Sequence, residues 1–193
     1  MKPNASIFVV LALFITACQP KESSRASDAA VGTDNLAVEI ARGEYLVTAI
    51  GCNDCHTPKI FGPQGMSLDY DRLLSGHPAS EDLASYDTLT TGSWVLMSPS
   101  LTAYVGPWGT SFASNLTPDG TGIGTWTEAQ FAKAIREGKA KGLDGARPLL
   151  PPMPWQNLVN LSDEDVHDIF TYLKSLKPVR NIVPNPLPSM AVK

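Results

Sequence analysis

The sequence has few charged residues and no strongly basic stretch. Asp, Glu, Lys and Arg make up 18% of its 193 residues, and 15 basic against 19 acidic side chains give a net charge of −4. Nucleic-acid binding requires a basic face that neutralises phosphates, so this composition argues against nucleic acid as a partner. An acidic chain can instead dock on a protein that presents a basic face.

Long hydrophobic runs are also scarce. The apolar run from Ile7 to Ala17 has about eleven residues, whereas a membrane-spanning helix needs roughly 20. With Lys2 before it, this run has the plan of an export signal. It ends in Ile15-Thr16-Ala17-Cys18, which resembles the lipobox of bacterial lipoproteins, in which the cysteine is lipidated and becomes the mature N-terminus. An ordinary cleaved signal beside an incidental Cys18 is the alternative.

The lipobox resemblance implies a location on the periplasmic side of a bacterial membrane. Several acyl chains on Cys18 would hold the protein stably on a bilayer, since a single chain binds only marginally. In Gram-negative lipoproteins an aspartate after the lipidated cysteine favours the inner membrane. Gln19 stands at that position, so the resemblance slightly favours the outer membrane.

The length supports one compact domain with tails. We predict a signal peptide over residues 1–17 and a lipidated N-terminus with a flexible linker over 18–35, because the linker lacks large apolar side chains. A globular domain is predicted over 36–180 and a Pro-rich C-terminal tail over 181–193. Internal repeats are absent.

Cysteine is rare, and two of the three cysteines form the pentapeptide Cys52-Asn53-Asp54-Cys55-His56. This C-x-x-C-H pattern is typical of c-type haem attachment, in which both thiols form thioethers and the histidine ligates the iron. A structural zinc site would need about four ligands, usually from two Cys/His pairs, and no second C-x-x-C exists. A thioredoxin-like pair would leave the adjoining histidine unused. The single motif therefore predicts one haem c, bound covalently through Cys52 and Cys55 with His56 on the iron.

The second axial ligand must come from elsewhere in the chain. Met153 is the favoured residue, because Pro151-Pro152-Met153-Pro154 fixes the backbone around a flexible thioether. It also lies just before a C-terminal helix that can hold the loop over the haem. The other donors that we considered are Met66, Met97, Met190, His77 and His167. We expect His77 to be a loop residue and His167 to be solvated on a helix flank.

Apolar spacing and capping signals predict the secondary structure. A helix is expected from about 37 to 50, ending at Gly51, and a short helix within Ser67 to Leu83. Short strands are expected at 94–97, 104–105 and 110–112, where a small β-hairpin covers one edge of the haem. Two further helices are expected after the capping residues Thr127 and Ser162, the first ending at Gly138 and the second stopped by Pro178.

These elements together resemble the class I c-type cytochromes. The residues that carry the resemblance are the C-x-x-C-H motif, the Met153 loop and the terminal helix. Residues 115–127 and 150–155 are also similar to modules in the cytochrome subunits of bacterial membrane-bound alcohol and aldehyde dehydrogenases. Those subunits contain several C-x-x-C-H modules in series, whereas this chain has one.

The resemblance implies a mostly α fold of three or four helices around the haem, with a β-hairpin or irregular insertion after the haem motif. It implies that Gly43 packs against Tyr172 or Phe170 where the first and last helices cross. Candidate donors to the haem propionates are Trp126, Trp155 and Arg147.

The predicted function is that of a membrane-tethered electron carrier rather than an enzyme, with redox proteins as partners. A thioether ligand favours reduced iron, so we expect a higher potential than that of a bis-histidine haem. The alternatives are a haem subunit of a dehydrogenase or oxidase complex, and a haem-based gas sensor with a labile Met153.

Overall fold

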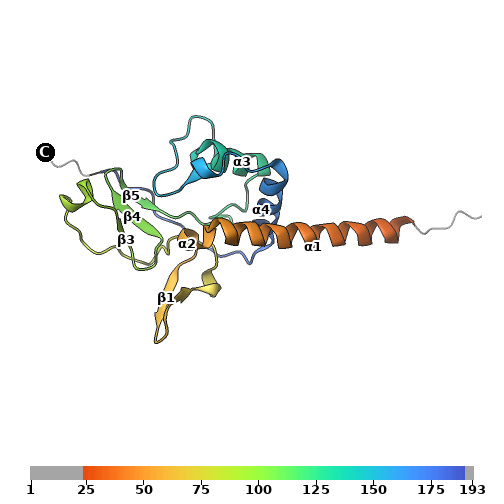
Figure 1. Ribbon diagram of the computed structural model, residues 1–193, viewed down its shortest axis with the longest axis horizontal. Helices are drawn as coiled ribbons and strands as arrows, with labels where there is room; N and C mark the ends of the chain where they lie inside the picture. The colour runs from red at the N-terminus through yellow and green to blue at the C-terminus, as the bar shows by residue number, and fades with distance from the viewer. Residues whose placement is uncertain (1–23, 190–193) are drawn as a thin grey trace, which may run out of the picture.

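The computed structural model describes residues 24–189 of the chain. Within them, helices, short strands and 3-10 turns are joined by long loops (Figure 1). The helices are α1 (Ser24–Ile50), α2 (Cys52–His56), α3 (Glu128–Glu137) and α4 (Asp163–Ser175). The strands are β1 (Lys59–Gly62), β2 (Gly65–Leu68), β3 (Leu96–Met97), β4 (Ala103–Gly106) and β5 (Gly109–Phe112). The 3-10 turns are Tyr70–Arg72, Thr90–Gly92, Ala140–Gly142 and Trp155–Asn157.

The helix boundaries largely agree with the sequence signals. Thr127 and Ser162 each form a capping box at the start of α3 and α4, and α3 ends at Gly138 in a left-handed conformation, as predicted. The first helix ends at Ile50 but begins at Ser24 rather than near 37, so it includes residues that we expected in a flexible linker. Its N-terminal half extends away from the rest of the domain in Figure 1. The predicted signal peptide and Cys18 lie outside the described residues.

Helices α1 and α4 cross in close contact at Gly43. A Cβ atom at this glycine would lie 2.0 Å from the carbonyl oxygen of Asp168 and 2.7 Å from the Cβ atom of Tyr172. The predicted contact of Gly43 with Tyr172 is therefore confirmed. Arg42 strengthens the crossing, since its Nε atom lies 3.0 Å from a carboxylate oxygen of the buried Asp168.

The core lies where α1, α3 and α4 meet. It contains Val47 from α1, Phe131 and Ile135 from α3, and Leu173 from α4, all buried. These residues repeat at helical spacing in the sequence, so each helix buries one apolar face. No helix in the described part of the chain is long and apolar enough to cross a membrane.

The region between α2 and α3 contains more β-structure than we predicted. Strands β3, β4 and β5 form an antiparallel sheet at the positions expected for the hairpin. Strands β1 and β2 form an additional hairpin directly after α2, in which Phe61 pairs with Met66. The short helix predicted within Ser67 to Leu83 is present only as the three-residue 3-10 helix at Tyr70–Arg72, and residues 67–68 belong to β2.

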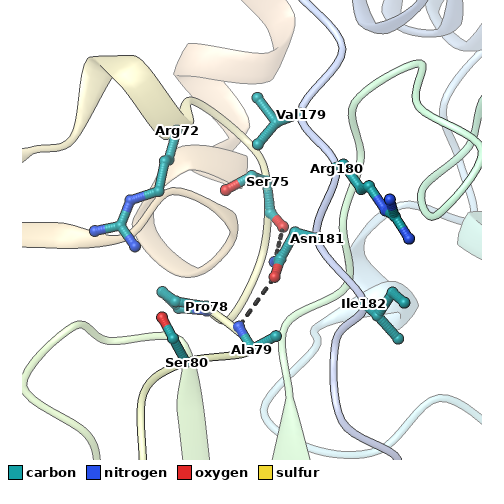
Figure 2. Close-up of a pocket in the computed structure, with 9 residues that line it drawn as sticks. All are labelled: Arg72, Ser75, Pro78, Ala79, Ser80, Val179, Arg180, Asn181 and Ile182. Carbon is teal, nitrogen blue, oxygen red and sulfur yellow. Dashed lines mark hydrogen bonds between the residues drawn. The ribbon is translucent and has the colours of Figure 1, made fainter.

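The C-terminal segment belongs to the fold. Leu187 exchanges two backbone hydrogen bonds with Thr110 of β5, at 2.9 and 3.0 Å. The Asn181 amide donates to the carbonyl groups of Ser75 and His77 at 2.7 and 2.8 Å and accepts from the backbone N–H of Ala79 at 3.0 Å. Figure 2 shows this junction in a pocket of about 390 Å³. None of the predicted haem residues lines that pocket.

Candidate haem site

The C-x-x-C-H motif forms a single short helix. Gly51 precedes it with φ of 85°, a left-handed conformation that separates α2 from α1 and that a glycine adopts readily. Cys52 and Cys55 are three positions apart on this helix, so their side chains lie on the same side. Both cysteines are free and partly buried, and Cys52 packs against the core. A single group on that side of α2 can therefore reach both thiols.

The imidazole of His56 is held in one orientation. Its Nδ1 atom lies 2.7 Å from the carbonyl oxygen of Ser114. A carbonyl can only accept, so Nδ1 carries the proton and donates it, which leaves Nε2 free to ligate a metal. Such a hydrogen bond to the second ring nitrogen is the usual way in which a protein fixes a ligating histidine. Burial lowers the pKa of His56, which favours the neutral ring that a metal requires.

The surroundings of the two thiols do not suit thiol-disulfide chemistry. Burial raises the pKa of the Cys52 thiol to about 11. Redox-active C-x-x-C pairs depend on a lowered thiol pKa, because the thiolate is the nucleophile. In the described part of the chain no group of three or more Cys, His, Asp or Glu side chains could hold a metal ion. Neither the thioredoxin-like nor the zinc alternative gains support from this geometry.

Met153 lies in the long connection between α3 and α4, residues 138–162. Its side chain is partly buried and packs against the core that Cys52 also contacts. The backbone N–H of Met153 donates to the carbonyl of Leu150 at 3.2 Å, which closes a tight turn. The structure thus brings the predicted second ligand to the same core as the attachment motif, although nearly 100 residues separate them in sequence.

The other methionines and histidines occupy less suitable positions. The side chains of Met66 and Met97 are 52% and 60% exposed, and Met190 lies outside the described residues. His77 is in a loop as predicted, but it is fully buried, with its ring nitrogens near Thr102 Oγ1 (2.9 Å) and the Glu81 carbonyl (3.3 Å). His77 is therefore a hydrogen-bonded core histidine.

His167 is less solvated than we expected. It lies on α4, and its Nδ1 atom is 2.9 Å from a carboxylate oxygen of Glu128 on α3, while Nε2 is 3.6 Å from Glu39 on α1. The hydrogen bond to Glu128 raises the pKa of His167. This side chain is 45% exposed and connects three helices at the surface.

The three candidate propionate donors differ in their surroundings. Trp126 is partly buried against the core. The ring of Trp155 packs on Gly138, where a Cβ atom would come within 2.4 Å of it. Arg147 is exposed and donates to the carbonyl of Pro148 at 2.8 Å. Their contact with propionates stays a prediction.

Two groups beside the motif were not predicted from the sequence. The hydroxyl of Tyr104 on β4 lies 3.0 Å from the sulfur of Cys55 and 2.6 Å from the carbonyl of Leu101. The second is the Ser114 carbonyl that orients His56. A backbone carbonyl is independent of residue type, so no sequence pattern points to it. Tyr104 could have been suspected only from its place in the predicted strand at 104–105.

Comparison with known proteins identifies the family of the chain. The family model described as cytochrome c matches residues 40–177, which is more than half of the chain. The chain belongs to the cytochrome c family, and haem c attached at Cys52 and Cys55 is its cofactor. In line with the predicted resemblance, several similar proteins are cytochrome subunits of bacterial dehydrogenases.

Three relatives illustrate this similarity. The chain is 43% identical over 149 residues to one of the subunits of the nicotinate dehydrogenase of Pseudomonas putida, covering 77% of the chain and 9% of that protein. It is 40% identical over 156 residues to the cytochrome c subunit of a quinone alcohol dehydrogenase of Gluconacetobacter polyoxogenes, covering 78% and 26%. It is 33% identical over 142 residues to the fructose dehydrogenase cytochrome subunit of Gluconobacter japonicus, covering 72% and 22%. The chain thus spans about a quarter or less of each relative.

Proposed function

We propose that this protein is a one-haem electron carrier in which His56 and Met153 are the axial ligands. The observation that carries the proposal is the fixed imidazole of His56, whose Nδ1 proton is donated to Ser114 so that Nε2 is free to act as a ligand. Met153 supports it, since its thioether is packed against the core that Cys52 contacts. With both axial positions filled by the chain, the iron has no open site for a substrate, so we infer that the protein is not itself an enzyme.

The chemistry is divided between cofactor and chain. Haem c supplies reversible one-electron oxidation and reduction. Cys52 and Cys55 anchor the group covalently, His56 presents an unprotonated nitrogen, and Met153 supplies a soft sulfur donor that favours the reduced state. Cys52 and Met153 both pack against the apolar core, and an apolar environment also tunes a haem potential.

Dehydrogenases are the proposed electron donors. The names of the relatives describe cytochrome subunits of dehydrogenases, and the chain matches a part of each of them. The acidic balance of the sequence fits a partner with a basic docking face. We further propose that lipidated Cys18 tethers the domain to the periplasmic side of a bacterial membrane, because residues 15–18 resemble a lipobox. The outer membrane is slightly favoured, because Gln19 rather than an aspartate follows the cysteine.

A permanent haem-carrying component of a dehydrogenase complex is the second candidate function. The relatives named above favour it, since they are subunits rather than free carriers. Co-purification from detergent-solubilised membranes separates the two candidates. A carrier is recovered alone, whereas a permanent component is recovered in constant ratio with a dehydrogenase.

Substitution of Met153 by alanine tests the ligand assignment. The wild-type protein should be low-spin, with the weak thioether-to-iron band near the red edge of the oxidised spectrum. In Met153→Ala this band should disappear, and the reduced protein should bind carbon monoxide readily. Met97→Ala is the matched control, because its exposed thioether lies on β3, and its spectrum should match that of the wild type.

An unaltered spectrum in Met153→Ala would remove this residue as the ligand. High-spin wild-type iron that binds carbon monoxide readily would instead contradict the carrier and favour the gas sensor.

A further inference from the structure

The loop that contains Met153 is fixed at both ends to the C-terminus of α3. On one side of Met153, the backbone N–H of Leu149 donates to the carbonyl of Gly138 at 2.7 Å. On the other side, the ring of Trp155 packs against the same glycine, leaving no space for a Cβ atom there. These contacts hold the ends of the loop and leave its centre, next to Met153, to be fixed by other groups.

The centre of the loop is held by a hydrogen bond from the β-sheet. Ser111 Oγ lies 2.6 Å from the carbonyl oxygen of Pro151, and Trp108 Nε1 lies 3.2 Å from Ser111 Oγ. A carbonyl only accepts and an indole N–H only donates, so the hydroxyl must accept from Trp108 and donate to Pro151. The direction of this two-bond chain is therefore determined by the groups in it.

Ser111 is itself rigidly placed. It lies in β5, which pairs with β4 along one edge and with Leu187 along the other. The side chain is only 7% exposed, so water does not readily replace the serine hydroxyl as a partner for Pro151. The β3–β4–β5 sheet thus contacts the Met153 loop through the buried hydroxyl of Ser111, which binds Pro151, two residues before the methionine.

We propose that Ser111 is a positioning residue for the axial methionine: its hydrogen bond to the Pro151 carbonyl holds the Met153 loop closed and keeps the thioether at the iron. This inference rests on the proposed function, because it requires Met153 to be the ligand. It also gives the inserted β-sheet a role, since the sheet fixes Ser111 on one side of the loop while α3 fixes the ends of the loop on the other.

Exogenous imidazole measures how often the loop opens, because it binds the iron of the oxidised protein only when Met153 has left. Its apparent dissociation constant equals the intrinsic one divided by the fraction of open protein. Loss of a single buried hydrogen bond that holds the loop closed should raise the fraction of open protein about five- to tenfold. We therefore expect Ser111→Ala to bind imidazole about five- to tenfold more tightly than the wild type, followed as loss of the thioether-to-iron band.

Ser98→Ala is the matched control. Ser98 is 9% exposed, directly follows β3, and its hydroxyl lies 3.0 Å from that of Ser100 and accepts from the backbone N–H of Ala103 at 3.3 Å. The substitution thus removes a buried serine hydroxyl that does not contact the Met153 loop. We expect Ser98→Ala to lose stability while its imidazole affinity remains that of the wild type. Ser111→Thr retains a hydroxyl and should also keep the wild-type affinity.

The possible results distinguish a failure of the Ser111 role from a failure of the proposed function. Tighter imidazole binding in Ser111→Ala alone supports the positioning role. Equal affinity in Ser111→Ala and the wild type overturns it, and so does an equal increase in Ser111→Ala and Ser98→Ala, which would indicate general loosening. A wild-type spectrum without the thioether-to-iron band contradicts the proposed function itself, and the role of Ser111 falls with it.

Discussion

Substitution of Gly43 by alanine is predicted to weaken the contact between the first and last helices. Two effects oppose each other at this position. Alanine is favoured over glycine inside a helix by about 1 kcal/mol, so helix propensity alone predicts a more stable protein. The added Cβ atom, however, would lie 2.0 Å from the carbonyl oxygen and 2.6 Å from the carbonyl carbon of Asp168. These are backbone atoms of α4, which cannot move aside as the end of a flexible side chain can.

The expected loss of unfolding free energy follows from the size of this steric overlap. Ordinary contacts of a Cβ atom begin near 3.4 Å, so the helices must separate by more than 1 Å at their crossing. Overpacking of this kind costs about 1–3 kcal/mol and occasionally more, and the backbone contact places Gly43→Ala at or above the upper end. After subtraction of the propensity gain, we expect a net loss of at least ~2 kcal/mol. That corresponds to roughly a thirtyfold change in the ratio of folded to unfolded protein.

The free energy of unfolding can be measured by denaturant titration of the oxidised haem protein, followed by helical circular dichroism. Gly120→Ala is the control, because Gly120 is an exposed loop residue and a Cβ atom there would meet nothing within 4 Å. Its stability should change by less than about 0.5 kcal/mol. A Gly43→Ala protein that is as stable as the wild type, or more stable, would refute the close crossing. Helix propensity would then outweigh the steric cost in the free energy of unfolding.

Two further predictions concern His167 and Asn181. The pKa of His167 is raised by its hydrogen bond to Glu128, so its contribution to stability is complete below about pH 6.5 and is lost as pH rises through the raised pKa. Because the side chain is 45% exposed, the free energy of unfolding of the wild type should exceed that of His167→Gln by only ~0.5 kcal/mol in mild acid. The difference, measured by chemical unfolding, should vanish in alkali. A difference that does not depend on pH would contradict this role of His167. Asn181→Ala should lose about 1–3 kcal/mol of unfolding free energy, because three backbone groups lose their partner. Asn185→Ala, in the exposed part of the same segment, should change little, and equal losses in both variants would indicate that the Asn181 hydrogen bonds are unimportant.

Features that depend on local sequence could be predicted well. The capping boxes at Thr127 and Ser162 satisfy backbone groups a few residues away, so their pattern is visible in sequence. The C-x-x-C-H motif likewise carries its geometry within five residues. Met153 could be selected because the surrounding prolines restrict the loop, and the structure places it against the core that Cys52 contacts.

Features that depend on distant contacts could not be predicted in the same way. The β1–β2 hairpin shows no alternation of buried and exposed side chains, because both of its faces are largely exposed. The early start of α1 could not be predicted, because its first residues lack large apolar side chains at helical spacing. The Ser111 hydrogen bond joins residues 40 positions apart through a backbone carbonyl, so no residue pattern indicates it.

The pairing of the first and last helices also constrains the order in which this protein is made. Arg42 meets its aspartate partner Asp165 across 123 residues, and Asn181 bonds to Ser75 across 106. Contacts of such long range cannot form until the end of the chain has been synthesised, whereas the N-terminal part emerges first. Until α4 packs on α1, the Cys52–His56 segment is therefore reachable as an open chain. We expect covalent attachment of the cofactor to precede folding, and closure of the Met153 loop to be among the last steps of maturation.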